Sequence, residues 1–186
     1  MNTISVFLCS AAAVGTAFVV PTAASATSLS CAAERGVDAT VVDGATGCRA
    51  ASDHRGQARS DGIDGVGYAR ATLGATALGV GVAGGIGASE GAGGMPIALG
   101  VGPDAVALSR VVDDHLRDGP AVGVAIAFGG SRSEVGGTPD GAVVCLGSGA
   151  FAWNMQSGAS CLATPFGMWR SPVSLPQPPD QPPAVW

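Results

Sequence analysis

The sequence predicts an all-β protein, either a glycine- and alanine-rich β-roll or a narrow β-solenoid or meander, and three observations predict it. Residues 61–109 hold fourteen of the thirty glycines in the chain. Bulky and tiny residues alternate in this part of the chain with a period of two, which is typical of strands rather than helices. The segment GATALGVG at 74–81 returns, with one insertion, as GMPIALGVG at 94–102. Repeats of about 20 residues are typical of solenoids.

The alternation separates two faces of very different size. Leu78 and Val80 would point to one side of a strand, and the intervening glycines and alanines to the other. A solvated face usually carries Thr, Lys, Glu or Arg, yet the only charges between residues 71 and 109 are Glu90 and Asp104. We therefore expect the tiny face to allow close approach of another backbone.

This glycine content has an energetic consequence. A glycine costs roughly 0.5–1 kcal/mol relative to alanine inside a regular element, so fourteen of them approach the roughly 5–15 kcal/mol stability of a whole domain. Stacking of repeats, cross-links or association with other chains must offset that cost.

Residues 1–26 are predicted to be a secretory signal peptide. An apolar run at 6–20 is followed by Pro21 and an A-x-A site at 24–26. The run is short for a membrane span of about 20 apolar residues, and no second apolar segment long enough to span a membrane follows it. We expect a secreted or cell-envelope protein with no membrane span in the mature chain.

The charge of the chain excludes some partners. The formal net charge is −5, and the nine basic residues are all arginines scattered along the sequence. Nucleic acids and anionic membrane surfaces are bound by clustered basic residues, so neither is an expected partner.

Four cysteines remain if Cys9 leaves with the leader: Cys31, Cys48, Cys145 and Cys161. An even number in an exported chain predicts two disulfides, for which three pairings are possible. The pairing Cys31–Cys48 with Cys145–Cys161 is preferred, because each bond then closes a short loop at one end of the repeat region. A four-cysteine zinc site is the rival, but no C-x-x-C spacing is present.

The sequence suggests four segments. The leader 1–26 is followed by a disulfide-closed segment at 27–60, which ends in a polar loop over 49–60. The glycine-rich β domain is expected at 61–170, and a disordered or polyproline tail at 171–186.

Within the β domain, the passage 104–118 is ambiguous. Leu108, Val111, Val112 and Leu116 would form one face of a helix. Alternation on both flanks instead favours two strands joined by a hairpin connection, and we prefer this interpretation. The strands expected after the repeats are 104–112, 121–129, 141–147 and 149–154.

Four aromatic residues hold most of the aromatic mass of the mature chain. Phe151, Trp153, Phe166 and Trp169 all follow the repeats. We expect them to cap one end of the roll.

Several motifs that suggest chemistry are better explained by composition. Ser89 lies in G-x-S-x-G, the motif of a hydrolase nucleophile, with His115 downstream as a base. That motif needs a strand before it and a helix after it, and here more glycines follow. The G-x-G-x-x-G match at 79–84 likewise lacks the context of a dinucleotide-binding fold. His54 and His115 lie in polar segments, where solvated side chains are expected. No catalytic residue, metal site or cofactor is predicted.

Two resemblances add to this interpretation. The phrases A-L-G-x-G and A-x-A-L in the repeats resemble the head repeats of trimeric autotransporter adhesins, which form a narrow left-handed β-roll. This resemblance implies self-association, as a trimer, and adhesion. The chain as a whole resembles small exported actinobacterial proteins grouped as a domain of unknown function, on the evidence of its leader and the segments 88–108 and 147–162. The resemblance to that group implies that the chain is exported and shares the fold of the group, and it implies no activity.

The expected function is therefore that of an exported, non-enzymatic structural or interaction protein with an unknown surface or protein partner. The alternative is a small secreted hydrolase that uses Ser89 with His115. A ligand-binding β-barrel would need a cavity, and the tiny alternating residues predict a roll too thin to enclose one.

Overall fold

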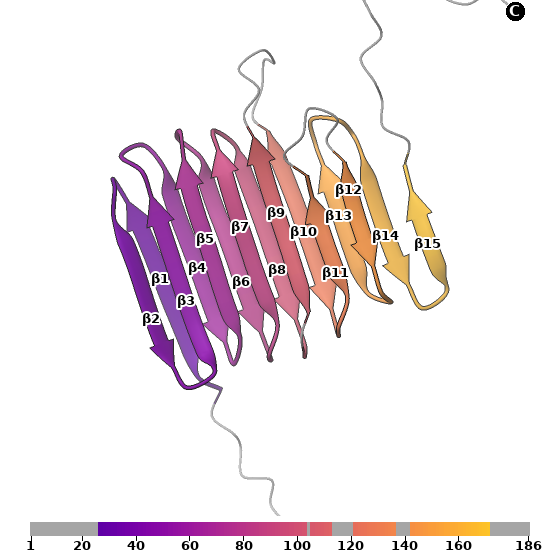
Figure 1. The fold of residues 1–186 in the computed structure, drawn as a ribbon, viewed down its shortest axis with the longest axis horizontal. Helices are drawn as coiled ribbons and strands as arrows, with labels where there is room; N and C mark the ends of the chain where they lie inside the picture. The colour runs from indigo at the N-terminus through magenta and orange to yellow at the C-terminus, as the bar shows by residue number, and fades with distance from the viewer. Residues whose placement is uncertain (1–25, 104, 113–120, 137–141, 172–186) are drawn as a thin grey trace, which may run out of the picture.

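The computed structural model describes residues 26–103, 105–112, 121–136 and 142–171. These residues form fifteen strands in two stacked sheets and contain no helix (Figure 1). The protein is a β-solenoid of about three turns. The all-β prediction is confirmed.

Sheet A has eight strands. In spatial order they are β1 (Ser28–Glu34), β4 (Gln57–Ile63), β6 (Thr76–Val82), β8 (Met95–Val101), β10 (Val122–Phe128), β13 (Ala150–Asn154), β14 (Ser160–Thr164) and β15 (Gly167–Arg170). Sheet B has seven strands, in the order β12 (Val143–Leu146), β11 (Arg132–Val135), β9 (Val106–Val112), β7 (Ile86–Ala92), β5 (Val66–Thr72), β3 (Thr46–Ser52) and β2 (Asp38–Asp43).

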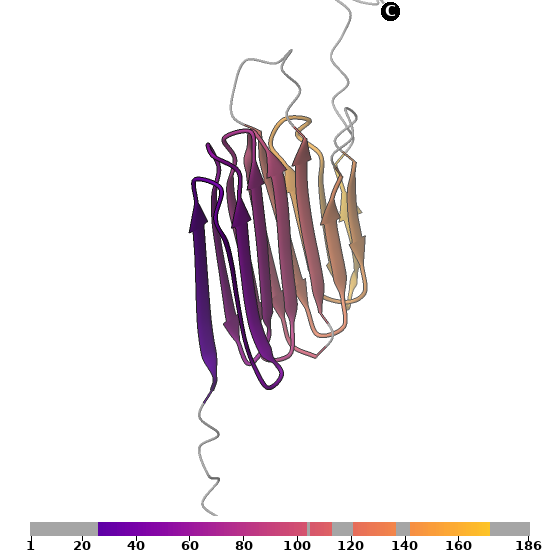
Figure 2. The same cartoon turned by 60° about the vertical axis from the view of Figure 1, so that its left-hand side comes forward.

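Between β3 and β11, successive strands alternate between the two sheets, so the chain winds as a flat coil whose turns stack (Figure 2). Neighbouring turns pair in parallel and in register, with Leu78 beside Ile97 in sheet A and Tyr68 beside Ala88 in sheet B. The repeated segments therefore occupy equivalent positions in successive turns. Antiparallel strands close the sheets at both ends: β1 and β2 at one, and β12 to β15 at the other.

The glycine and alanine face points inward, as predicted, and the two sheets touch through their backbones. A Cβ atom added to Gly79 would lie 1.9 Å from the Tyr68 carbonyl oxygen of the facing sheet. At Gly87 it would lie 2.0 Å from the Val80 oxygen. No side chain fits at these positions, so the sheets lie closer than the roughly 10 Å usual for stacked sheets.

Serine hydroxyls inside the coil bond across this narrow gap. Ser89 Oγ donates to the Pro96 carbonyl oxygen at 3.0 Å, and Ser109 Oγ donates to the Gly123 carbonyl oxygen at 2.8 Å. Both bonds run from sheet B to sheet A. A buried hydroxyl without a partner would cost about 1–3 kcal/mol, so these bonds make serine compatible with an interior otherwise made of alanine and glycine.

Each disulfide joins the two sheets at one end of the coil. Cys31 in β1 is bonded to Cys48 in β3, and Cys145 in β12 is bonded to Cys161 in β14. The preferred pairing is confirmed, and the zinc alternative is wrong. A buried cluster rich in alanine surrounds each bond. The cluster around Cys145–Cys161 also contains Val135, its largest fully buried aliphatic residue.

The polar loop expected over 49–60 is wrong. Strand β3 continues to Ser52 and β4 begins at Gln57, so only residues 53–56 connect them. The strands were hidden because their outward positions carry polar residues such as Arg49 and Arg59, while Ala50 and Ala58 face inward. The boundary at residue 60 falls inside β4, and the N-terminal segment belongs to the same two sheets.

The structure settles part of the ambiguous passage 104–118. Strand β9 covers Val106–Val112, so the helical alternative is wrong there, whereas residues 113–120 lie outside the described residues. The other predicted strands are confirmed with shorter bounds, as β10, β12 and β13. Of the tail predicted at 171–186, only Ser171 is described.

The aromatic cap is also wrong. Phe151 and Trp153 occupy outward positions on β13, and Phe166 lies in the turn before β15 with 94 % of its surface exposed. The interior at that end is filled by alanine, valine and a disulfide, which leaves no room for rings.

Backbone contact between the sheets predicts that two similar substitutions will differ sharply. Gly87→Ala places a methyl group 2.0 Å from a carbonyl oxygen, and we expect it to lower the free energy of unfolding by about 3 kcal/mol or more. Gly47→Ala, in strand β3 of the same sheet, meets nothing closer than 3.7 Å and should change it by less than about 1 kcal/mol. Chemical denaturation measures both values, and equal effects would contradict the packing described.

The disulfides are expected to stabilise the two ends separately. Replacing Cys31 and Cys48 together with alanine should lower the free energy of unfolding by about 3 kcal/mol, because a cross-link over 17 residues restricts the unfolded chain. Replacing Cys145 and Cys161, which span 16 residues, should cost a similar amount. Denaturant unfolding of both pair variants tests this, and an unchanged midpoint in either would count against the assignment.

Candidate functional site

The interior is too narrow for a binding site, so the candidate surfaces are the outer faces of the two sheets. On sheet A, the outward positions of β6, β8, β10, β13, β14 and β15 carry no charged residue among those described. We call these positions the apolar face. Its central row crosses six hydrogen-bonded strands and consists of Val80, Leu99, Ile126, Phe151, Leu162 and Trp169.

The apolar face is large for a surface left in water. Three strands of seven residues and three of four or five residues, at about 3.3 Å per residue and spaced about 4.8 Å apart, give it a projected area of about 500–600 Å². Trp153, Leu162 and Trp169 remain 37 %, 42 % and 54 % exposed. Contiguous apolar patches of this size on soluble proteins commonly mark interaction sites.

The apolar face ends at β4, where charge appears. Arg59 and Asp61 occupy outward positions there, with Arg59 Nε 3.8 Å from Asp61 Oδ2. Ser30 Oγ on the neighbouring β1 also donates to the Asp61 carboxylate, at 2.5 Å. This pair is therefore a polar border to one side of the apolar face.

The outer face of sheet B carries most of the ion pairs. Arg70 Nη1 lies 3.5 Å from Glu90 Oε1, and Arg132 Nη2 lies 3.1 Å from Glu134 Oε2. An apolar row that includes Val66 and Ile86 runs beside these charges. Sheet B therefore presents a mixed surface, whereas sheet A is uncharged over the apolar face from β6 to β15.

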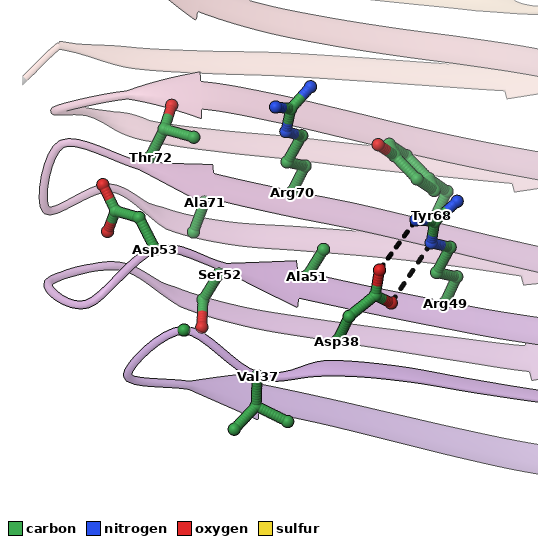
Figure 3. A pocket seen from close by; sticks show the side chains of 11 residues that line it. Val37, Asp38, Arg49, Ala51, Ser52, Asp53, Tyr68, Arg70, Ala71 and Thr72 are labelled. Atoms are coloured by element: carbon green, nitrogen blue, oxygen red, sulfur yellow. Dashed lines mark hydrogen bonds and ion pairs between the residues drawn. The ribbon is translucent and has the colours of Figure 1, made fainter.

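A groove of about 480 Å³ lies on sheet B across β2, β3 and β5 (Figure 3). Arg49 donates to the two carboxylate oxygens of Asp38, at 2.7 Å from Nη2 and 3.2 Å from Nε. These bonds hold the pKa of Asp38 below its ordinary value, and they raise the pKa of Arg49. Tyr68 and Arg70 extend from β5 on the other side of the groove.

The groove carries both signs of charge, and its acids have partners. Asp38 is paired with Arg49, Arg70 lies beside Glu90, and Asp53 accepts backbone hydrogen bonds. A second hollow of about 260 Å³ continues from Tyr68 towards Arg110 along the same face. The charges along the groove are already paired with each other, so the groove suits weak polar contacts better than capture of an ion.

Asp53 organises the turns at one end of this groove. Its carboxylate accepts from the backbone N–H of Leu73 at 2.6 Å, and from those of Arg55 and Gly56 at 2.9 and 2.6 Å. It therefore ties the turn after β3 to the turn after β5. The hydrogen bond from Leu73, followed by that from Arg55, lowers the pKa of Asp53.

Among the residues that the structure describes, the sequence candidates are not brought together. Ser89 is 1 % exposed inside the coil, and its hydroxyl is bonded to a carbonyl oxygen, which gives no support to a nucleophilic role. His115 lies outside the described residues, and His54 is exposed in the turn before β4. The glycines of the 79–84 match form strand β6 and a turn into β7, with no helix following.

Two kinds of feature are absent from the parts of the chain that the structure describes. There, no three His, Cys, Asp or Glu side chains are grouped so that they could hold a metal ion. The same residues include no helix long and apolar enough to cross a membrane.

The rows of side chains on the two outer faces were not predicted from the sequence. Arg49, Tyr68, Ala88 and Leu108 share one row of sheet B because each lies one solenoid turn after the last. Aligning the repeat from residue 46 would have placed them together. Asp38 could not be found in this way, because β2 is antiparallel and lies outside the repeat.

The depressed pKa of Asp53 predicts a pH dependence that a single substitution should reduce. Its carboxylate stabilises the fold fully above its unfolded pKa of about 3.9, and this contribution is lost as pH falls through the lower folded value. Wild-type protein should therefore lose thermal stability below about pH 4 more steeply than Asp53→Asn. Melting temperatures of both proteins between about pH 2 and 6 test this, and parallel curves would contradict the role of the carboxylate.

Comparison with known proteins adds a family but no activity. No curated protein and no solved structure matches the chain. One family of unknown function, DUF6764, matches residues 1–164, which include fourteen of the fifteen strands in full and both disulfides. The chain belongs to this uncharacterised family.

Proposed function

We propose that this chain is an exported, non-enzymatic structural or interaction protein of the cell envelope or the extracellular space. The observation that carries the proposal is the apolar face of sheet A, which crosses six strands without a charged residue at any outward position. A face of this kind gains stability when another surface removes it from water, at roughly 25 cal/mol per Å² of apolar area.

The interior supports the same proposal. Gly79 and Gly87 admit no side chain, and Ser89 is used for a bond between the sheets. A coil filled in this way offers its outer surface, rather than an internal cavity, for recognition. Binding to another surface therefore fits the architecture better than conversion of a substrate.

Two features support export. Two disulfides at the ends of the coil suit an oxidising compartment. The predicted leader at 1–26 would direct the chain into the secretory pathway.

Export is tested by producing the complete sequence, with its leader, in a secreting bacterial host. We expect the product outside the cytoplasm, beginning at Thr27, with four cysteines that resist alkylation until a reductant is added. Mass spectrometry of each cell fraction measures both properties. A full-length cytoplasmic product with free thiols would contradict the proposal, as would an esterase or peptidase activity that Ser89→Ala abolishes.

A further inference from the structure

We infer that the apolar face of sheet A binds the same face of a second copy of the chain, in a dimer whose two-fold axis runs along the direction in which the solenoid turns stack. This inference rests on the proposed function and names its partner. Three observations carry it: the chemistry of the face, its size, and the position of one charged pair.

The chemistry of the face requires an apolar partner. Its central positions hold Val80, Leu99 and Ile126, which offer no hydrogen-bond donor or acceptor. A polar surface placed against them would lose its water without compensation. The same face of another copy is apolar over the same outline, and stacked sheets with interleaved side chains are a stable arrangement.

The size of the face fits one side of an interface between two folded chains. Its projected area is about 500–600 Å², and its accessible surface area is larger because the side chains protrude from the sheet. Stable interfaces bury about 800 Å² on each partner. Two copies joined through this face would approach that value, and both would lose an exposed apolar surface.

The charged pair on β4 selects the orientation. A two-fold axis along the stacking direction sets each strand of sheet A against the same strand of the other copy, running in reverse. Arg59 of each copy then approaches Asp61 of the other. A two-fold axis parallel to the strands and through the middle of sheet A would set β4 against β14, whose outward residues Ser160, Leu162 and Thr164 carry no charge.

The same orientation matches the rest of the face. Arg59 and Asp61 belong to two adjacent rows of sheet A. When Arg59 of one copy lies opposite Asp61 of the other, the whole row of Arg59 lies opposite the row of Asp61 in the other copy. Ile97 then packs against Leu99 of the other copy, and Trp153 packs against its Phe151. Bulky residues meet bulky residues along both rows from β6 to β13, where the rings meet rings, and on β14 Ser160 meets Leu162 of the other copy.

The first test is the mass of the oxidised, secreted protein in solution, measured by sedimentation equilibrium over a micromolar concentration range. We expect a dimer, and we expect Leu99→Glu to weaken it at least about 100-fold, because two carboxylates would be buried without partners. Ile86→Glu is the matched control, since Ile86 faces outward from a central strand of sheet B and is 40 % exposed. It should leave the dimer intact.

The second test uses charge reversal on β4, where the side chains of Arg59 and Asp61 are 69 % and 28 % exposed. Arg59→Glu should weaken the dimer about tenfold by placing like charges opposite each other. The double variant Arg59→Glu with Asp61→Arg should restore it, because each new charge again meets its opposite. Thermal unfolding of each variant verifies that it is folded.

The outcomes separate this inference from the proposed function. A monomeric or trimeric wild-type protein would overturn the dimer, as would a dimer that Ile86→Glu breaks and Leu99→Glu leaves intact. Failure of the double variant to restore association would overturn the orientation. All of these leave export unaffected, whereas a cytoplasmic, reduced product overturns the proposed function whatever its mass.

Discussion

The structure depends on one constraint: the backbones of two β-sheets lie in contact, with only hydrogen, methyl groups and serine hydroxyls between most of their strands. Added Cβ atoms at Gly79, Gly87 and Gly100 would meet carbonyl oxygens of the facing sheet at 1.9–2.1 Å. Such spacing excludes larger side chains from the interior, so nearly every bulky or charged residue in the repeats occupies an outward position. The distribution of chemistry over the molecule follows from this exclusion.

A thin interior also changes what stabilises the chain. Buried alanines contribute little hydrophobic free energy per residue compared with leucine or phenylalanine. Regular ladders, hydroxyl bonds such as Ser109 to the Gly123 carbonyl, and two disulfides that join the sheets at both ends compensate for this. Many of the larger apolar side chains lie on the outer face of sheet A, where a single copy leaves them partly in water. Self-association would therefore complete the burial that the fold itself cannot provide.

The sequence was most informative where one face of a strand is apolar. Leu78 and Val80 alternate visibly with alanine and glycine, and this predicted both the strands and the close approach of the sheets. In 49–60 the outward residues are polar, so strands with the same inward alanines were taken for a loop. The candidate surfaces required three-dimensional register, because Asp38 and Arg49 meet across a hairpin, and the apolar face joins repeat strands to the meander of β13 to β15. Ser89, in the G-x-S-x-G match that composition was expected to explain, lies inside the coil with its hydroxyl bonded to a carbonyl oxygen.

The backbone contact between the two sheets is tested most directly by nuclear Overhauser measurements on the oxidised protein in solution, which report short distances between protons. The structure places the inward side of Gly87 against the backbone of Val80, and that of Gly100 against the backbone of Ile86. We predict strong cross-peaks between the α-protons of these glycines and the amide protons of Val80 and Ile86. Their absence, with glycine α-protons instead close to side chains of the facing sheet, would show sheets at ordinary spacing and would contradict the account.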